Sequence, residues 1–258
     1  MIELIAQLGR LALGFVEHLG RIALFLVEIV LSALRPPFRL KRIVEEIYKL
    51  GFLSLVVISV CGLAVGMVLG LQGYNTLVRF GSEEALGAVV GLSLVRELGP
   101  VLTALLATGR AGSATAAEIG AMVATQQLDG LRMMSVDPID YVVRPKALAM
   151  TTVMPMLCAI FVCAGLFGGF IVGVGLMGMD PGTFMGNMRD AVDFEDDVGG
   201  CLLKALLFGA MVGLISTYRG YTSAPTSEGV SSATTSTVVI ASVAVLIADY
   251  FFTALWGV

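Results

Sequence analysis

Four ionisable residues lie inside long apolar stretches of this sequence, and they are the first place where chemistry is to be expected. They are Arg96, Glu97, Lys204 and Asp249. A charged side chain at the centre of a membrane costs about 2.5 to 3.5 kcal/mol on insertion scales, so such residues usually pair with one another or face a polar cavity. Two of the four are cationic and two are anionic. They could therefore form structural ion pairs, line a cavity for a charged ligand, or carry protons through Glu97 and Asp249.

The composition places these charges in a membrane protein. Of the 258 residues, 57% are hydrophobic and only 14% are charged, whereas soluble domains carry about 25% charged residues. The apolar runs reach about 20 residues, which is long enough to cross the hydrocarbon core as helices. The short alternating segments of a transmembrane barrel are absent. The sequence therefore predicts an all-α membrane protein, and its net charge of -4 gives no support to nucleic-acid binding.

Five apolar runs are the predicted membrane spans, and they cover residues 50–72, 85–109, 147–178, 198–218 and 234–256. An acidic loop at residues 180–197 precedes the fourth. Charges in residues 1–34 are mostly seven positions apart, which places them in one stripe along a helix. This pattern predicts an amphipathic helix in the membrane interface, not a span or a cleavable signal peptide. We expect one domain over residues 1–258, with this helix and a basic connector in 1–49 and a five-span bundle in 50–258.

Gly62, Gly66 and Gly70 repeat at every fourth position of the first span. A stripe without side chains allows another helix backbone to approach closely, so these glycines are predicted to pack against a helix. The neighbouring helix could belong to the same subunit or to a second copy of the chain. Both interpretations remain open at this point.

The distribution of Lys and Arg orients the spans. With the N-terminus in the cytoplasm, the outer loops carry only Arg79 and Arg189. The other basic residues outside the spans then lie on the inner side: Arg10, Arg21, Arg35, Arg39, Lys41, Arg42, Lys49, Arg110, Arg132, Arg144, Lys146 and Arg219. Cytoplasmic segments of membrane proteins are enriched in Lys and Arg. We therefore predict a cytoplasmic N-terminus and, after five spans, a C-terminus on the opposite side.

The expected depth of the four buried charges favours a shared site. At about 1.5 Å per helical residue, Arg96 and Glu97 lie about 16 to 18 Å from the outer end of their span, Lys204 about 9 Å and Asp249 about 10 Å. All four thus fall at mid-depth or in the outer half of the membrane. Adjacent helical residues point about 100° apart, so Arg96 and Glu97 should pair with other helices and not with each other. We predict a neutralised cluster that borders a pocket open to the outer side.

A polar, alanine-rich segment separates the second and third predicted spans. Residues 112–137 read GSATAAEIGAMVATQQLDGLRMMSVD, which is too polar and too interrupted to cross a membrane. Its Ala, Met, Gln and Leu favour a helix at about 113–135, and the orientation above places this helix in the cytoplasm. We interpret it as a docking element for a soluble partner, with candidate contact residues Glu118, Met122, Gln126, Gln127, Asp129 and Leu131.

The same region carries an ordered series of motifs: Glu97-Leu-Gly-Pro-Val-Leu-Thr-Ala, Gly109-Arg-Ala-Gly-Ser-Ala, Ala117-Glu-Ile-Gly-Ala-Met, Gln127-Leu-Asp-Gly-Leu and Val136-Asp-Pro. In this order they closely resemble the MlaE-type permease family, and the resemblance covers essentially the whole chain. These permeases are membrane subunits of ABC transporters that move phospholipid between the two membranes of Gram-negative bacteria, with relatives in chloroplasts. One departure is Gln126, where we expect Glu in many relatives, so the docking surface has one charge fewer.

The resemblance implies a location, a function and a set of partners. The chain would lie in the Gram-negative inner membrane and move phospholipid between that membrane and the periplasm or outer membrane, which maintains outer-membrane lipid asymmetry. It would form a homodimer with two cytoplasmic ATPase subunits, a STAS-domain regulator and a periplasmic hexamer of MCE-domain proteins. The segment from Glu118 to Leu131 would be the coupling helix that contacts the ATPase. The four buried charges would border the lipid cavity, as their depth suggests independently.

No catalytic centre or energy source is predicted in the chain itself. It contains no GxxxxGK(S/T) phosphate loop, so ATP and Mg²⁺ would be bound by the partner ATPase, and the chain would need no cofactor of its own. It contains no HExxH motif, and its cysteines lack the spacing of metal ligands, which predicts neither a catalytic nor a metal site. The cysteines are interpreted as small apolar residues: Cys61, Cys158, Cys163 and Cys201.

Two other functions remain open from the residues alone. The first is an ion-coupled secondary transporter or channel in which Glu97 and Asp249 carry protons. It would depend on a proton gradient and would need no ATPase. The second is a scaffold that only anchors other subunits, and this would tolerate neutralisation of the four buried charges.

Overall fold

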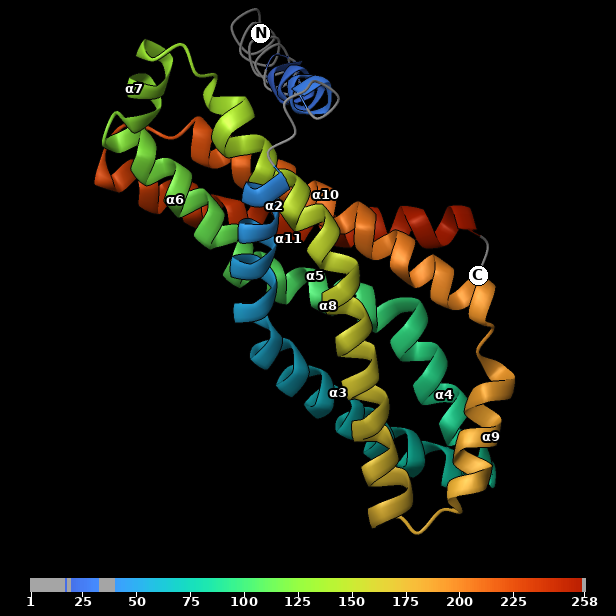
Figure 1. The fold of residues 1–258 in the computed structure, drawn as a ribbon. Coiled ribbons are helices and arrows are strands. Elements are labelled where there is room, and N and C mark those ends of the chain that lie inside the picture. Colours follow the sequence, from blue (N-terminus) through green and yellow to red (C-terminus); the bar gives the residue numbers. More distant parts are fainter. Residues whose placement is uncertain (1–16, 18–19, 33–39, 257–258) are drawn as a thin grey trace, which may run out of the picture.

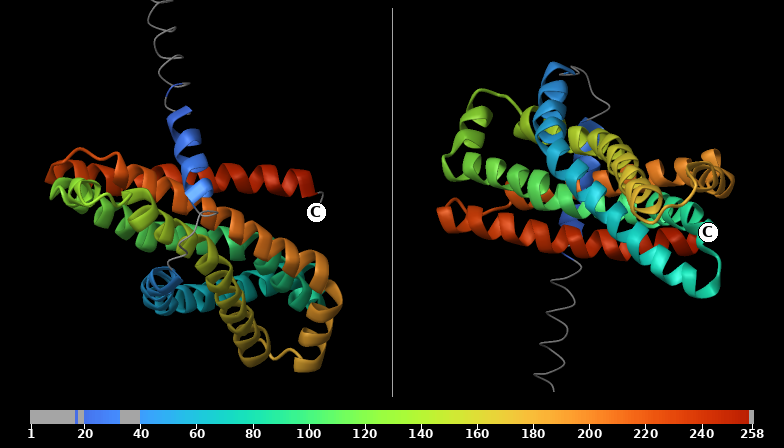
Figure 2. Two further views of the ribbon diagram at one scale, coloured as in Figure 1. Left: turned by 45° about the horizontal axis from the view of Figure 1, so that its top comes forward. Right: turned by 90° about the horizontal axis from the view of Figure 1, so that it is seen from below.

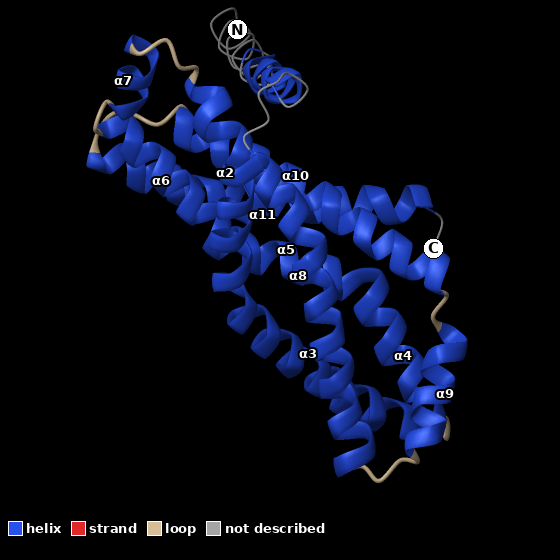
Figure 3. Cartoon of the chain, viewed as in Figure 1, coloured by secondary structure: helices blue, strands red, loops and turns tan. Residues whose placement is uncertain are grey.

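The computed structural model describes residues 17, 20–32 and 40–256, and almost all of them are helical (Figures 1 and 3). Five helices are long and apolar enough to cross a membrane: Leu40–Phe80, Glu83–Ala124, Ile139–Leu176, Phe194–Tyr221 and Ser227–Leu255. Each overlaps one of the predicted spans. The described residues form no strand. The prediction of an all-α membrane protein with five spanning helices is therefore confirmed.

Most of the long helices consist of shorter helices joined by π-helical or 3₁₀ turns. The first comprises α2 (Leu40–Ile47), η1 (Tyr48–Phe52), α3 (Leu53–Leu77) and η2 (Val78–Phe80). The second comprises η3 (Glu83–Ala85), α4 (Leu86–Ser93), η4 (Leu94–Leu98), α5 (Gly99–Ala107), η5 (Thr108–Gly112) and α6 (Ser113–Ala124). The others are η6 (Ile139–Val143), α8 (Arg144–Phe170) and η7 (Ile171–Leu176), then η8 (Phe194–Val198) and α10 (Gly199–Tyr221), and finally α11 (Ser227–Trp256). Two short helices, α7 (Gln127–Met133) and α9 (Pro181–Ala191), lie between long ones.

Helix α8 forms the centre of the bundle, since it packs most extensively against α3 and α10. On α3, the repeated glycines Gly62, Gly66 and Gly70 are buried and face α8. A Cβ atom added to Gly66 would lie 1.8 Å from the backbone oxygen of Gly165 in α8, so only glycine permits this approach of the two backbones. The glycine repeat is therefore accounted for by packing within one chain, which was one of the two open interpretations.

The helix predicted at about 113–135 is divided in the structure. Helix α6 continues the second long helix to Ala124 and packs against α10 and α11. Only α7 stands apart, after a turn in which Gln126 has a left-handed φ of 57°. The small residues of α6 explain the difference, because a Cβ atom on Gly220 of α10 would lie 2.9 Å from the backbone oxygen of Ala116. The Ala and Gly residues that suggested an exposed segment form a close helix contact instead.

Helix α9 lies in the stretch that was predicted as an acidic loop. Asp180 caps its N-terminus by accepting a hydrogen bond from the backbone N–H of Thr183 (2.8 Å), and Pro181 is its first residue. Both features are typical of a helix start and were visible in the sequence. Phe184 is fully buried, and its backbone lies against Gly87 of α4. In Figure 1, α9 lies beside α4 at one end of the bundle and α7 lies at the other. We call these the α9 end and the α7 end.

The N-terminal region is described only in part. Residues 20–32 form a helix that crosses the long helices at a steep angle on one side of the bundle (Figure 2). The ring of Phe25 packs edge-on against Tyr218 of α10, with centroids 5.4 Å apart, and the backbone oxygen of Ser32 accepts a hydrogen bond from Arg144 (2.5 Å). These contacts attach the helix to α8 and α10. The remainder of the predicted interfacial helix lies outside the described residues: 1–16, 18–19 and 33–34.

Candidate functional site

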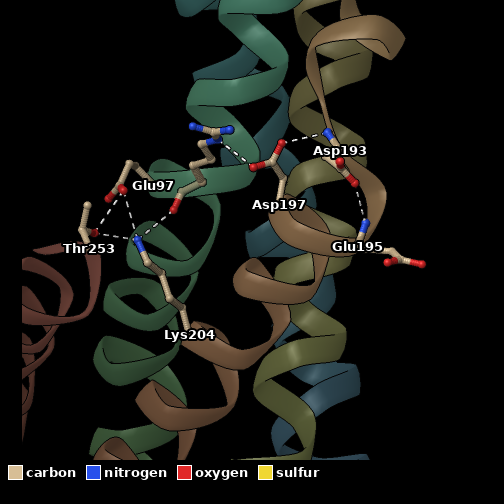
Figure 4. A network of polar contacts seen from close by, with 7 residues as sticks. Glu97, Asp193, Glu195, Asp197, Lys204 and Thr253 are labelled. Atoms are coloured by element: carbon tan, nitrogen blue, oxygen red, sulfur yellow. Dashed lines mark hydrogen bonds and ion pairs between the residues drawn. The ribbon is translucent and has the colours of Figure 1, made fainter. Parts of the chain in front are cut away.

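Three of the four predicted buried charges form one network around Lys204 of α10. Its Nζ atom lies 3.0 Å from Glu97 Oε1 and 3.4 Å from Asp249 Oδ1. The same amine donates hydrogen bonds to the Thr253 hydroxyl (2.8 Å) and to the backbone oxygen of Arg96 (3.0 Å), and Thr253 in turn donates to Glu97 (3.1 Å) (Figure 4). The network thus joins the second, fourth and fifth long helices around an ammonium group that is only 7% exposed.

The fourth charge, Arg96, forms its ion pair outside this network. Its Nε atom lies 2.7 Å from Oδ1 of Asp197 in η8, a residue that the sequence analysis assigned to the outer loop. The expectation of one cluster of four charges is therefore wrong, and two adjacent ion-pair groups take its place. The expectation that Arg96 and Glu97 pair with other helices is confirmed.

Local backbone structure brings Asp197 into the site. Asp193 caps η8 by accepting a hydrogen bond from the Glu195 N–H (3.0 Å), and its own N–H donates to Asp197 (2.8 Å) (Figure 4). Asp197 precedes Lys204 by seven residues, which is about two helical turns, so both side chains project from one face. This spacing was the feature of the sequence that could have assigned Asp197 to the site. Thr253, which contacts both Lys204 and Glu97, had no such sequence feature.

A small pocket of about 20 Å³ lies beside these charges, which is room for about one water molecule. Its walls come from four helical segments and consist of Arg96, Glu97, Asp196, Asp197, Gly200, Cys201, Lys204, Phe252 and Thr253. The side chains of Arg96 and Glu97 are 38% and 42% exposed, in contrast to Lys204. The charges therefore border open space on one side, but this pocket alone is too small for a lipid.

The predicted docking residues lie at the α7 end of the bundle. Gln126, Gln127 and Asp129 are exposed, whereas Met122 and Leu131 pack against the buried Leu128. Asp129 pairs with Arg132 (3.1 Å), whose guanidinium also donates to the Tyr221 hydroxyl (2.6 Å). This contact with Tyr221 raises the pKa of Arg132 above its ordinary value, so the side chain stays cationic.

Glu118 lies outside this group and pairs instead with a lysine. Its carboxylate is 2.6 Å from Nζ of Lys146 at the start of α8, and the same ammonium lies 3.1 Å from Glu46 of α2. Glu118 is nevertheless 43% exposed. It can therefore contact a partner at the same time as it holds Lys146.

Within the described part of the chain, no group of three or more His, Cys, Asp or Glu side chains is arranged to hold a metal ion. All four cysteines are free. The thiols of Cys158 in α8 and Cys201 in α10 lie 3.5 Å apart in the core, where they pack as small residues between the two helices.

Comparison with known proteins assigns the family. Residues 43–255 match the family described as Permease MlaE. The chain is 44% identical, over 99% of its length and 98% of the relative's, to the intermembrane phospholipid transport system permease protein MlaE of Haemophilus influenzae. It is 37% identical to a probable ABC transporter permease protein of Rickettsia bellii over 99% of this chain and 98% of that protein. It is also 31% identical to the chloroplastic protein TRIGALACTOSYLDIACYLGLYCEROL 1 of Arabidopsis thaliana, over 86% of this chain and 63% of that protein. The chain therefore belongs to the MlaE family of ABC transporter permeases.

Proposed function

We propose that this permease moves phospholipid between the inner membrane and the periplasm or outer membrane of a Gram-negative bacterium, and so maintains outer-membrane lipid asymmetry. The full-length similarity to a phospholipid transport permease supports this substrate. The observation that carries the proposal is that Arg96 and Glu97, members of two adjacent ion-pair groups, stay partly exposed within the apolar bundle. An amphiphile with two acyl chains and a charged headgroup has the chemistry to match a polar group set in an apolar surface.

Arg96 is the residue we assign to the headgroup phosphate. Lys204 is enclosed by four acceptors, whereas Arg96 engages Asp197 through Nε alone. Its two Nη groups are then available for a bidentate contact with phosphate, which guanidinium favours. The nearby carboxylates Glu97 and Asp249 would limit the affinity, so that the lipid can also leave.

The small volume of the pocket supports a second copy of the chain as the other wall of the lipid cavity. Apolar side chains on α10 and α11 are exposed in the single chain and would cover acyl chains or a partner subunit. They include Leu203, Leu206 and Leu207 on α10, and Val243, Leu246, Ile247 and Tyr250 on α11. We therefore propose a homodimer in which the two Arg96 groups face a shared apolar space.

Energy would come from a cytoplasmic ATPase that binds ATP and Mg²⁺ and contacts the α7 end. The contact would include Glu118, Met122, Gln126, Gln127, Asp129 and Leu131. The excess of Lys and Arg supports this end as cytoplasmic, with the N-terminus in the cytoplasm and the C-terminus in the periplasm. A STAS-domain regulator and a hexamer of MCE-domain proteins on the periplasmic side complete the proposed assembly.

The test compares Arg96→Glu with Arg79→Glu in the transporter purified with its partner subunits and reconstituted in phospholipid vesicles. Arg79 is exposed and lies outside the charged pocket. We expect the Arg96→Glu variant to lose lipid transfer activity and to copurify without bound lipid. The Arg79→Glu variant should retain the activity and the bound lipid. Equal activity of the two variants would remove Arg96 from the lipid path. Transport that needs a proton gradient and no ATPase would replace the proposal with the ion-coupled function of Glu97 and Asp249.

A further inference from the structure

A second and larger hollow lies beside the charged pocket. It is an apolar groove of about 830 Å³ between the second long helix, α8, α9 and the start of the fourth long helix. This volume is within the range of about 300 to 1,000 Å³ that is typical of ligand pockets. Arg189 is the single charged residue among the lining side chains, which include Val95, Ala159, Cys163, Leu166, Met185 and Phe194. We call this hollow the apolar groove.

The walls of the apolar groove are open to the surroundings of the protein. Phe194 is 79% exposed and Met185 is half exposed at the α9 end, and Ala159 and Cys163 are exposed on α8. The α8 wall of the groove belongs to a membrane-spanning helix, and exposed side chains of such a helix lie against the acyl chains of lipids. Exposed apolar side chains around a concavity are thus in contact with the molecules that we propose the protein transports.

The apolar groove adjoins the charged pocket directly. Cys201 lines both hollows. Val95 and Val198 line the groove and are the chain neighbours of Arg96 and Asp197, so the ion pair between these two residues lies where the hollows meet. A lipid that leaves the groove toward the bundle therefore meets Arg96 next.

Arg189 supplies a positive charge at the edge of the apolar groove. It is exposed on the last turn of α9, and among the residues that the structure describes it forms no ion pair. A guanidinium beside an apolar concavity is complementary to a phosphate attached to acyl chains.

We propose that the apolar groove is a phospholipid-binding site, in which one acyl chain occupies the groove and the phosphate contacts Arg189, on a lateral path between the bilayer and Arg96. This inference rests on the proposed function and adds a second site to it. The groove extends along α8 from Ala159 to Leu166, which is about 10 Å of helix. A guanidinium at the edge of an apolar groove matches a phosphate that carries acyl chains, so the charge of Arg189 favours a phospholipid over an apolar helix of a partner.

The test uses the assembled transporter in vesicles of phosphatidylethanolamine and phosphatidylglycerol that contain a phospholipid with a photoactivatable diazirine in one acyl chain. Cross-linked residues are mapped by mass spectrometry after illumination. We expect labelling of Cys163 and Leu166 to exceed that of Met156 by about fivefold, because lipid should occupy the groove more often than the ordinary helix surface. Met156 is the matched control, because it is 63% exposed on the same helix but does not line the groove. Equal labelling of the three residues would show only ordinary bilayer contact and would overturn the proposal.

Variants then separate recognition of the phosphate from simple apolar contact. Arg189→Glu and Ala159→Trp should each lower labelling in the groove about fivefold, whereas Arg79→Glu and Met156→Trp should leave it unchanged. A diazirine-labelled diacylglycerol, which lacks the phosphate, should label equally with and without Arg189→Glu. If the lipid probe does not label Cys163, and a thiol-reactive cross-linker instead joins Cys163 to a transmembrane segment of a partner, the groove is a protein contact and the proposal is wrong.

Labelling near the charged pocket keeps this inference distinct from the proposed function. If Phe252 and Thr253 cross-link to lipid but the groove does not, the lateral site fails while the proposed function stands. If neither region cross-links to lipid, both fail.

Discussion

Two groups of ion pairs lie in this apolar bundle, those of Arg144 and Lys146 and those beside the charged pocket, and only the second group includes a partly exposed cation. At the α7 end, Arg144 and Lys146 are 1% and 4% exposed and hold carboxylates on other elements. Beside the charged pocket, Arg96 remains 38% exposed although its partner Asp197 is buried. A cation that is fully enclosed by partners from its own chain has no contacts left for a ligand. A half-open one does, and this distinguishes a structural ion pair from a candidate binding residue.

The polar contacts of the two cations at the α7 end reach segments that are far apart in the sequence, although Arg144 and Asp140 themselves are only four residues apart. Arg144 binds Asp140 in η6 and the backbone oxygen of Ser32, which attaches the helix of residues 20–32. Lys146 joins Glu46 of α2 to Glu118 of α6. These contacts fix the arrangement of the elements on which the proposed ATPase would act. The comparison predicts that changes at Arg144 and Lys146 mainly affect stability, while changes at Arg96 mainly affect transport.

The largest effect is expected for Arg144→Ala. Removal of one partner of a buried ion pair leaves the other charge uncompensated and costs about 3 to 5 kcal/mol. We expect a large loss of folded protein, measured as the yield of monodisperse permease and its thermal unfolding in detergent. Arg144→Lys keeps the charge but not the geometry of the guanidinium, so its stability should lie between that of Arg144→Ala and that of the unmutated protein. A stable Arg144→Ala variant would contradict a structural role for this residue.

Lys204→Met should have the next largest effect on stability. It leaves Glu97 and Asp249 close together without their shared cation, and Glu97 is partly hydrated, so we expect a loss of about 2 kcal/mol. The triple variant Lys204→Met, Glu97→Gln, Asp249→Asn should regain most of this stability, because no charge is left unpaired. Thermal unfolding measures both. If the triple variant also regains transport, the charges are structural and do not serve the lipid.

Arg96→Gln should lower the free energy of unfolding by about 1 kcal/mol and reduce the rate of transport about tenfold. The stability cost comes from Asp197, which keeps its hydrogen bond from the Asp193 N–H after the guanidinium is lost. The double variant Arg96→Gln, Asp197→Asn should restore stability without restoring transport, since it still lacks the phosphate contact. Lipid transfer between vesicles, measured beside thermal unfolding, separates the two effects. Parallel losses in both measurements would place Arg96 with the structural ion pairs.

The sequence predicted those features that depend on local composition. Uncharged apolar runs identified the five spans, and the depth of Glu97 and Lys204 along their helices brought them together correctly. The partner of Arg96 was missed because Asp197 lies in an acidic stretch whose last turn folds into the bundle. The extent of α6 was also missed, since Ala and Gly contribute little hydropathy but permit a close contact with α10. Such contacts depend on which helices become neighbours, and a single sequence does not specify this.

The smallest effect on stability is expected from Glu118→Gln. This variant also tests whether the ion pairs at the α7 end are purely structural. Glu118 and Glu46 bind the same ammonium of Lys146, but Glu118 is 43% exposed and Glu46 only 14%. After Glu118→Gln, Lys146 keeps Glu46, so the free energy of unfolding should fall by less than about 1 kcal/mol. If Glu118 also contacts the ATPase, its variant should weaken copurification of the ATPase.

Glu46→Gln is the matched control for this last change. It removes the more buried partner of Lys146 and should cost more stability than Glu118→Gln, because the remaining acceptor is more hydrated. It should nevertheless leave ATPase binding unchanged, since Glu46 is mostly covered by its own chain. If both variants weaken ATPase binding in proportion to their loss of stability, then Glu118 acts only through Lys146. In that case the ion pairs of Arg144 and Lys146 are purely structural, and the proposed ATPase contact must be confined to the exposed residues of α7.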